Sequence, residues 1–151
     1  MLASVLLVTS LGLLNAPGPA EAKERFDQTL AGIAIRGYDP VAYFTQSKAV
    51  KGSDTFAYEW LGATWHFASA EHRDLFMAEP INYAPQYGGY CTSGIVNSDI
   101  HSADPLIWRI IEGKLYLNGG TSALGNWADK GTEGIAATDA KWEKLEVKLT
   151  Q

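Results

Sequence analysis

The chain has 151 residues, of which 46% are hydrophobic and 19% are charged, and its formal net charge is −5. A chain of this size and composition can bury a hydrophobic core without disulfides, so we expect one ordinary globular domain. The acidic balance argues against binding to nucleic acid or to an anionic membrane surface.

The N-terminal segment has the pattern of a secretory signal peptide. The apolar run Leu2–Leu14 is too short to span a bilayer comfortably, and the small-residue pattern Ala20-Glu21-Ala22 follows it. We therefore expect cleavage after Ala22 and export to the periplasm or the extracellular space. No Lys or Arg precedes the run, which leaves open an uncleaved membrane anchor or a start further upstream.

The remainder divides into a short linker and one domain. We assign residues 23–34 to a polar linker and residues 35–151 to the domain. A short strand is expected from Ile33 to Tyr38, with Ala34 and Arg36 turned toward solvent because side chains alternate along a strand.

A helical turn and a hairpin are expected next. The pair Asp39-Pro40 offers a capping carboxylate followed by proline at the first helical position, where its missing N–H has no cost. This pair predicts a helical turn over Val41–Phe44. The stretches Phe56–Trp60 and Ala63–Phe67 flank Leu61-Gly62, which predicts an antiparallel hairpin.

A helix follows this hairpin and precedes the only cysteine. Ser69 is placed to accept hydrogen bonds from the first turn of the helix, and Pro80 marks its end. Residues three and four apart share one face of a helix, so one stripe should face the core. We assign to that stripe His72, Leu75, Phe76 and Glu79, and Met77 is also expected in the core.

Two adjacent glycines precede the cysteine. Gly88-Gly89 suits a tight turn or a close backbone approach, after which we expect a short helix over Thr92–Asn97. In the first turn of such a helix, the Cys91 thiol would lean toward the thiolate.

The C-terminal part predicts a second hairpin and two helices. Leu106–Ile111 and Lys114–Leu117 flank Glu112-Gly113, and Thr121 or Ser122 is suited to cap a short helix. The last helix should lie across the sheet through a stripe of Ile135, Thr138, Trp142, Leu145 and Leu149. We therefore predict an α+β fold: a small antiparallel sheet of two hairpins, with at least four strands, covered by several short helices and a longer C-terminal helix.

Five separated motifs occur in a fixed order, namely Asp39-Pro40-Val41, Trp65-His66-Phe67-Ala68-Ser69, Arg73-Asp74-x-Phe76, Pro80-x-x-Tyr83 and Tyr87-Gly88-Gly89-Tyr90-Cys91. Together they resemble the YHS domain family, in particular its secreted, single-domain branch of YHS domain-containing (seleno)proteins. The resemblance extends from about Ile35 to the C-terminus. Several motifs in one order are more specific than any one of them.

The resemblance implies a small metal-binding module related to the cysteine-rich domains of heavy-metal transporters and sensors. Three cysteine positions of that pattern fall on Ala42, Ala68 and His72 here, so two soft ligands are missing and an imidazole replaces the third. A site with three or four thiolates is therefore not inherited. The branch instead carries a cysteine after the paired glycines, here Cys91, and some members have selenocysteine there, which implies redox or soft-metal chemistry.

The cysteine and the histidines are the candidate site residues. As the only cysteine of an exported chain, Cys91 is an inert buried thiol, half of an intermolecular disulfide, or a functional thiol. His72 is either a structural group at the core edge or a metal ligand. His101, in a loop, is a third candidate ligand, whereas His66 is expected to be an exposed strand residue.

Our leading hypothesis is an exported protein that binds a soft transition metal ion through Cys91 with His72, with copper preferred over zinc. With so few ligands, a closed four-coordinate zinc site is not expected. One alternative is a thiol or peroxide redox protein that uses Cys91 without metal and is restored by an external thiol, with His72, Tyr87 or Tyr90 assisting proton transfer. The other is a non-catalytic interaction module.

The common catalytic motifs do not occur in the sequence. We find no G-x-S-x-G, H-E-x-x-H, G-x-G-x-x-G or phosphate-loop pattern, and a single cysteine cannot run an internal disulfide cycle. Whether the protein is an enzyme therefore stays open, as does its oligomeric state. The expected partners are a metal ion or an external thiol, without nucleic acid and without membrane beyond the signal segment.

Overall fold

The structure is a computed structural model that describes residues 25–149. The expected signal peptide, residues 1–22, lies outside the described residues. Within residues 25–149 the fold is α+β, as predicted, with two antiparallel hairpins and six α-helices.

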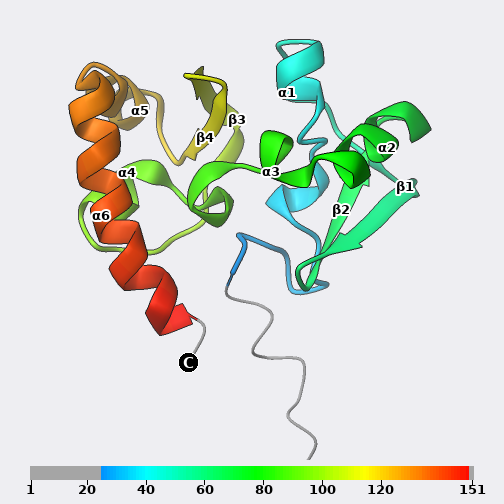
Figure 1. Cartoon of the computed structure of the whole chain (residues 1–151), viewed down its shortest axis with the longest axis horizontal. Coiled ribbons are helices and arrows are strands. Elements are labelled where there is room, and N and C mark those ends of the chain that lie inside the picture. Colours follow the sequence, from blue (N-terminus) through cyan, green and yellow to red (C-terminus); the bar gives the residue numbers. More distant parts are fainter. Residues whose placement is uncertain (1–24, 150–151) are drawn as a thin grey trace, which may run out of the picture.

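The elements form two groups that lie side by side in Figure 1. The first group contains the N-terminal hairpin and three short helices: α1 (Ala42–Thr45), β1 (Ser53–Trp60), β2 (Ala63–Phe67), α2 (Ala70–Ala78) and α3 (Pro80–Tyr83). The second group contains the C-terminal hairpin and its helices: the 3-10 turn η3 (Gln86–Gly89), α4 (Thr92–Val96), β3 (Asp104–Ile111), β4 (Lys114–Asn118), α5 (Thr121–Ala128) and α6 (Gly131–Leu149).

Both predicted hairpins are confirmed, but they do not join into one sheet. β1 pairs only with β2, and β3 pairs only with β4, so the expected four-stranded sheet is wrong. The register shifts within β1, between Ser53 and Ala57, and within β3, between Asp104 and Trp108. Such irregularities bend and twist a strand. The hairpins instead share a core through buried side chains of β2 and β4, among them Trp65 and Leu117.

The segment before α1 is part of the folded body. Phe26 and Asp27 are buried, so residues 25–34 are not the linker that we expected. The predicted strand over residues 33–38 is replaced by isolated bridges and a 3-10 turn, η2 (Ile35–Gly37). Ala34 is buried and not turned outward, because its N–H donates to the Thr64 carbonyl of β2.

Helix α2 begins and ends as predicted but buries fewer residues. The Ser69 hydroxyl accepts a hydrogen bond from the His72 N–H, which confirms the cap. His72 and Phe76 are buried, whereas Leu75 and Met77 are 37% and 47% exposed. The assignment of Leu75 and Met77 to the core is therefore wrong, as is that of Glu79 to the inward stripe, because Glu79 is also exposed. Of its two buried side chains, Phe76 packs on aromatic rings of the first hairpin, whereas His72 contacts Asp39 and Thr45.

The C-terminal helices pack on each other and on α4. α5 begins at Thr121 with Gly120 at the N-cap and without a side-chain cap, so the predicted hydroxyl cap is wrong. α6 contacts α4 and α5 and does not lie across a sheet, as Figure 1 shows. The ring centroids of its Trp142 and of Tyr87 lie 5.9 Å apart in a second, smaller core.

Among residues 25–149, no helix combines a bilayer-spanning length with sufficient apolar character.

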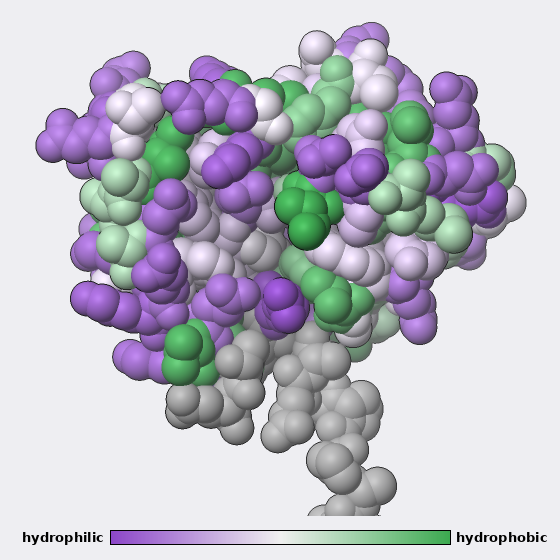
Figure 2. Space-filling view, viewed as in Figure 1, coloured by the Kyte–Doolittle hydropathy of each residue, from purple (hydrophilic) through white to green (hydrophobic). Residues whose placement is uncertain are grey.

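The surface in the same view is mainly hydrophilic. Figure 2 shows hydrophilic residues over α6 and apolar residues in small separate groups on this face. Exposed large apolar side chains include Ile81, at 79%, and Leu106, at 61%. They belong to different groups of elements, α3 and β3.

Candidate functional site

Backbone pairing brings the loop with His101 beside Cys91. Cys91 immediately precedes α4, and its N–H donates to the His101 carbonyl over 3.0 Å. Tyr90 and Ser102 form an antiparallel bridge directly next to this contact. The two segments therefore run side by side, and His101 is placed next to the cysteine although ten residues of sequence separate them.

The Cys91 sulfur has polar partners. Cys91 is only 2% exposed, and its thiol donates to Asn118 Oδ1 over 3.2 Å. The Gly119 N–H donates to the sulfur, also over 3.2 Å. Asn118, at the end of β4, is fully buried, and its Nδ2 donates to Ser93 Oγ over 2.8 Å. The thiol form has an acceptor for its hydrogen in Asn118 Oδ1, and the Gly119 N–H is the donor that would face a thiolate.

Cys91 and His101 line the same cavity of about 400 Å³. A side chain on Gly119 would reach into the gap between them: the position of its Cβ would lie 3.5 Å from Cys91 Sγ and 3.8 Å from His101 Cε1. His101 and Gly119 are exposed, so the cavity opens to solvent beside the imidazole. The polar side chains of the lining are those of Ser93, Asn97, Asp99, His101, Ser102 and Asn118.

A buried carboxylate is hydrogen-bonded to the two residues that follow His101. Asp27 accepts hydrogen bonds from Ser102 Oγ, over 2.7 Å, and from the Ala103 N–H, over 2.9 Å. Asp27 is 6% exposed. Because a buried charge that loses its partners is costly, these contacts fix the loop position. Sequence reasoning missed Asp27, since it lies in the segment assigned to a linker.

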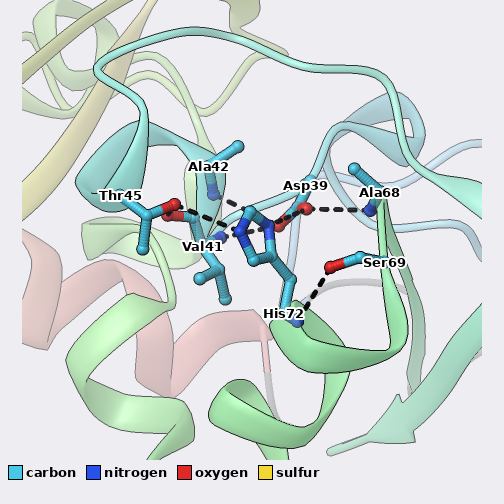
Figure 3. Close-up of polar contacts among 7 residues, drawn as sticks. All are labelled: Asp39, Val41, Ala42, Thr45, Ala68, Ser69 and His72. Carbon is cyan, nitrogen blue, oxygen red and sulfur yellow. Dashed lines mark hydrogen bonds and ion pairs between the residues drawn. The ribbon is translucent and has the colours of Figure 1, made fainter.

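His72 is not part of this cavity. Figure 3 shows its ring between two other side chains, with Nδ1 2.6 Å from Asp39 Oδ2 and Nε2 3.2 Å from Thr45 Oγ1. Both ring nitrogens therefore have partners. In Figure 1, α2 and α4 lie on opposite sides of the molecule. We correct the expectation accordingly: Cys91 and His72 do not form a shared ligand pair, and His101 is the histidine beside the thiol.

Asp39 links three elements through one carboxylate, as Figure 3 shows. It is fully buried, and Oδ1 accepts from the N–H groups of Val41 and Ala42, over 2.8 and 3.3 Å. Oδ2 accepts from the Ala68 N–H, over 2.8 Å, in addition to its contact with His72. The start of α1, the end of β2 and helix α2 are thus tied together. The three positions where the resemblance places cysteines converge on this carboxylate.

The remaining predicted groups face elsewhere. His66 is half-buried on β2, and its Nδ1 would be 3.3 Å from a Cβ on Gly37. The Tyr87 hydroxyl donates to Asp139 on α6 over 2.8 Å. Burial is the main cause that raises the pKa of Tyr87, and this hydrogen bond is the second. The Tyr90 hydroxyl donates to the Phe26 carbonyl. The two tyrosine hydroxyls are thus directed at partners other than Cys91.

The donor set does not form a multidentate metal site. Among the described residues, no group of three or more His, Cys, Asp or Glu side chains is arranged to hold a metal ion. The soft-metal donors that line one cavity are the thiol of Cys91 and the imidazole of His101.

Asn118 and Gly119 were missed as site residues, because the only sequence signal was an Asn-Gly-Gly stretch at the end of a strand.

We compared the chain with family models, with curated proteins and with solved structures, and none of the three comparisons gave a match.

Proposed function

We propose that this protein is a single-cysteine thiol redox protein in which Cys91 reacts with peroxides. One observation carries the proposal: Cys91, whose sulfur has polar partners, and His101 line the same cavity. A structural cysteine is typically surrounded by hydrocarbon. Cys91 does belong to the main hydrophobic core, but an amide oxygen and a backbone N–H also contact its sulfur.

The chemistry requires a thiolate, a peroxide and an external thiol. The Cys91 thiolate attacks one peroxide oxygen, so that an S–O bond forms while the O–O bond breaks. The leaving oxygen takes up a proton, and the products are a sulfenic acid and water or an alcohol. An external thiol then attacks the sulfenic sulfur and releases water, and a second external thiol restores Cys91 and leaves as the disulfide.

The two contacts of the sulfur suit these steps. The Gly119 N–H already points at the sulfur and can stabilise its negative charge without rearrangement. Asn118 Oδ1 accepts a hydrogen bond from the thiol in the resting form and another from the Gly119 N–H over 2.9 Å. Because Asn118 is fixed by Ser93, this arrangement is preorganised.

The test is to trap the sulfenic acid. The purified protein is treated with hydrogen peroxide in the presence of dimedone, and the intact mass is measured, with Cys91→Ser as the control. We expect one dimedone adduct on the native wild-type protein and none on Cys91→Ser. If the wild type forms the adduct only after unfolding in urea, Cys91 is a packing residue and the proposal is wrong.

A second function is favoured by the same cavity. Cu(I) binds readily to one thiolate and one imidazole, and His101 is the histidine available beside Cys91. This proposal replaces His72 by His101 in the metal hypothesis. Titration with Cu(I) under reducing conditions should give stoichiometric binding that is lost in both Cys91→Ser and His101→Ala. Binding that survives either substitution would reject this ligand pair.

We also propose that the protein is exported, on the basis of the Leu2–Leu14 run and the Ala20-Glu21-Ala22 pattern. The mass of the protein recovered from the exported fraction should correspond to a chain that begins at Lys23. Recovery of the uncleaved chain in the membrane fraction would contradict this.

A further inference from the structure

We infer that the open space over Gly119 is the substrate subsite of Cys91, and that it takes a small, neutral, hydrophilic hydroperoxide of the hydrogen peroxide type. This inference rests on the proposed function and adds to it the substrate class and a specificity-determining residue.

The space exists because residue 119 has no side chain. A Cβ there would meet Cys91 Sγ at 3.5 Å and His101 Cε1 at 3.8 Å, which are ordinary contact distances. An atom at this point thus touches the sulfur on one side and the imidazole on the other. It is the place where a peroxide oxygen in contact with the sulfur would also meet the His101 ring.

The walls of the cavity favour a polar guest. Apart from Ala123, the side chains that line it carry hydroxyl, amide, carboxylate, imidazole or thiol groups. A bulky apolar hydroperoxide would displace water from these polar groups and offer no hydrogen bonds in its place, which is unfavourable. Asp99, which is exposed, is also among the lining residues. Its charge, together with the net charge of −5, disfavours anionic hydroperoxides such as those of fatty acids.

The imidazole supplies the proton that the reaction needs. The ring atom nearest the subsite is Cε1, which is bonded to both ring nitrogens, so a peroxide or water in the subsite can pass the proton of the Cys91 thiol to the imidazole. The protonated ring then gives the proton to the oxygen that leaves when the O–O bond breaks. The net change is thiol plus hydroperoxide to sulfenic acid plus water or alcohol, so atoms and charge balance. His101 Nδ1 lies 3.3 Å from the Ser102 carbonyl, a contact that keeps the ring at the cavity rim.

The first arm of the test compares substrates on the wild-type protein. The second-order rate constant of Cys91 oxidation is measured with hydrogen peroxide, cumene hydroperoxide and a fatty-acid hydroperoxide. We expect hydrogen peroxide to react faster than either bulky peroxide by about tenfold or more. Equal or faster reaction with cumene hydroperoxide or with the fatty-acid hydroperoxide would overturn the inference.

The second arm fills the subsite with one methyl group. Gly119 does not have a positive φ, and a Cβ there makes only ordinary contacts, so Gly119→Ala should fold. Gly125→Ala is the matched control, because Gly125 lies in α5 and not among the residues that line the cavity, has no positive φ, and a Cβ there meets nothing within 4 Å. We expect Gly119→Ala to slow oxidation by hydrogen peroxide about tenfold or more and Gly125→Ala to change it by less than about twofold.

The outcomes separate this inference from the proposed function. If the wild type reacts and Gly119→Ala reacts at the same rate, the subsite is wrong while the thiol chemistry stands. If the native wild type reacts with none of the peroxides, the proposed function itself fails. The melting temperatures of both alanine variants are measured alongside, and the substrate comparison decides the inference without any variant.

Discussion

His72 Nδ1 lies 2.6 Å from Asp39 Oδ2, and Asp39 is fully buried. This contact shows why an inward-facing histidine need not be a metal ligand. One ring nitrogen contacts a carboxylate that also accepts hydrogen bonds from the start of α1 and from the end of β2. The other lies against Thr45 Oγ1. The imidazole is thus part of the framework of the first group of elements.

Asp39→Asn should therefore destabilise the protein strongly. The substitution removes the charge from a carboxylate that has four contacts in the core, so we expect a loss of about 2 to 4 kcal/mol in the free energy of unfolding. Urea unfolding at neutral pH measures this loss. Thr45→Val, at the exposed end of the same cluster, is the control and should cost less than about 1 kcal/mol. A stability loss for Asp39→Asn no larger than the control would contradict the structural role.

Local patterns were sufficient for most of the elements. Both hairpins were predicted because an apolar stretch stands on each side of a glycine turn, and the turns at Leu61-Gly62 and Glu112-Gly113 are those observed. The Ser69 cap followed from capping chemistry alone. Helical spacing did less well: it placed Leu75 in the core, because spacing gives the direction of a stripe but not the width that a neighbouring hairpin covers.

The candidate site was harder to predict, because its parts meet through long-range contacts. Helical spacing pointed to His72, which is inward but bonded to Asp39. His101 comes to Cys91 through the bridge of its loop to Tyr90, and the loop is held by Asp27 far away in sequence. No periodicity or capping rule encodes such a meeting. The sequence identified Cys91 as a candidate site residue, but it did not identify the residues that surround the sulfur.

The turn before Cys91 requires its glycines for a steric reason. Gly88 has φ +63°, and a Cβ there would run into the Arg25 carbonyl oxygen. Gly113 has φ +73° but a Cβ there meets nothing within 4 Å. Both alanine substitutions introduce similar backbone strain, so their difference isolates the clash.

We expect Gly113→Ala to lower the free energy of unfolding by about 1 kcal/mol and Gly88→Ala to lower it by clearly more. Chemical unfolding of the two variants measures both losses. If Gly88→Ala is no more destabilising than Gly113→Ala, the segment around Arg25 does not pack against the turn as described.

Alkaline pH should weaken the second core. The pKa of Tyr87 is raised mainly by burial and also by the hydrogen bond to Asp139. Burial raises the pKa of Tyr116 to about 12. In the unfolded chain these hydroxyls ionise near pH 10. The folded state therefore binds more protons above that pH, and the corresponding stabilisation is complete below about pH 10 and is lost as the pH rises further.

Unfolding curves between pH 8 and pH 11 measure this loss. Tyr87→Phe should be less stable at neutral pH, because the hydrogen bond to Asp139 is gone, and should lose less stability on the alkaline side. A pH profile of the variant parallel to that of the wild type would contradict the assignment.

The central claim is that His101, and not His72, assists the Cys91 thiol. The most direct measurement is the rate constant of Cys91 oxidation by hydrogen peroxide in His101→Gln and in His72→Gln, both kept under conditions where they are folded. We predict that His101→Gln slows the reaction by about tenfold or more, while His72→Gln leaves it within about twofold of the wild type. An unchanged rate in His101→Gln together with a slow reaction in His72→Gln would contradict the claim.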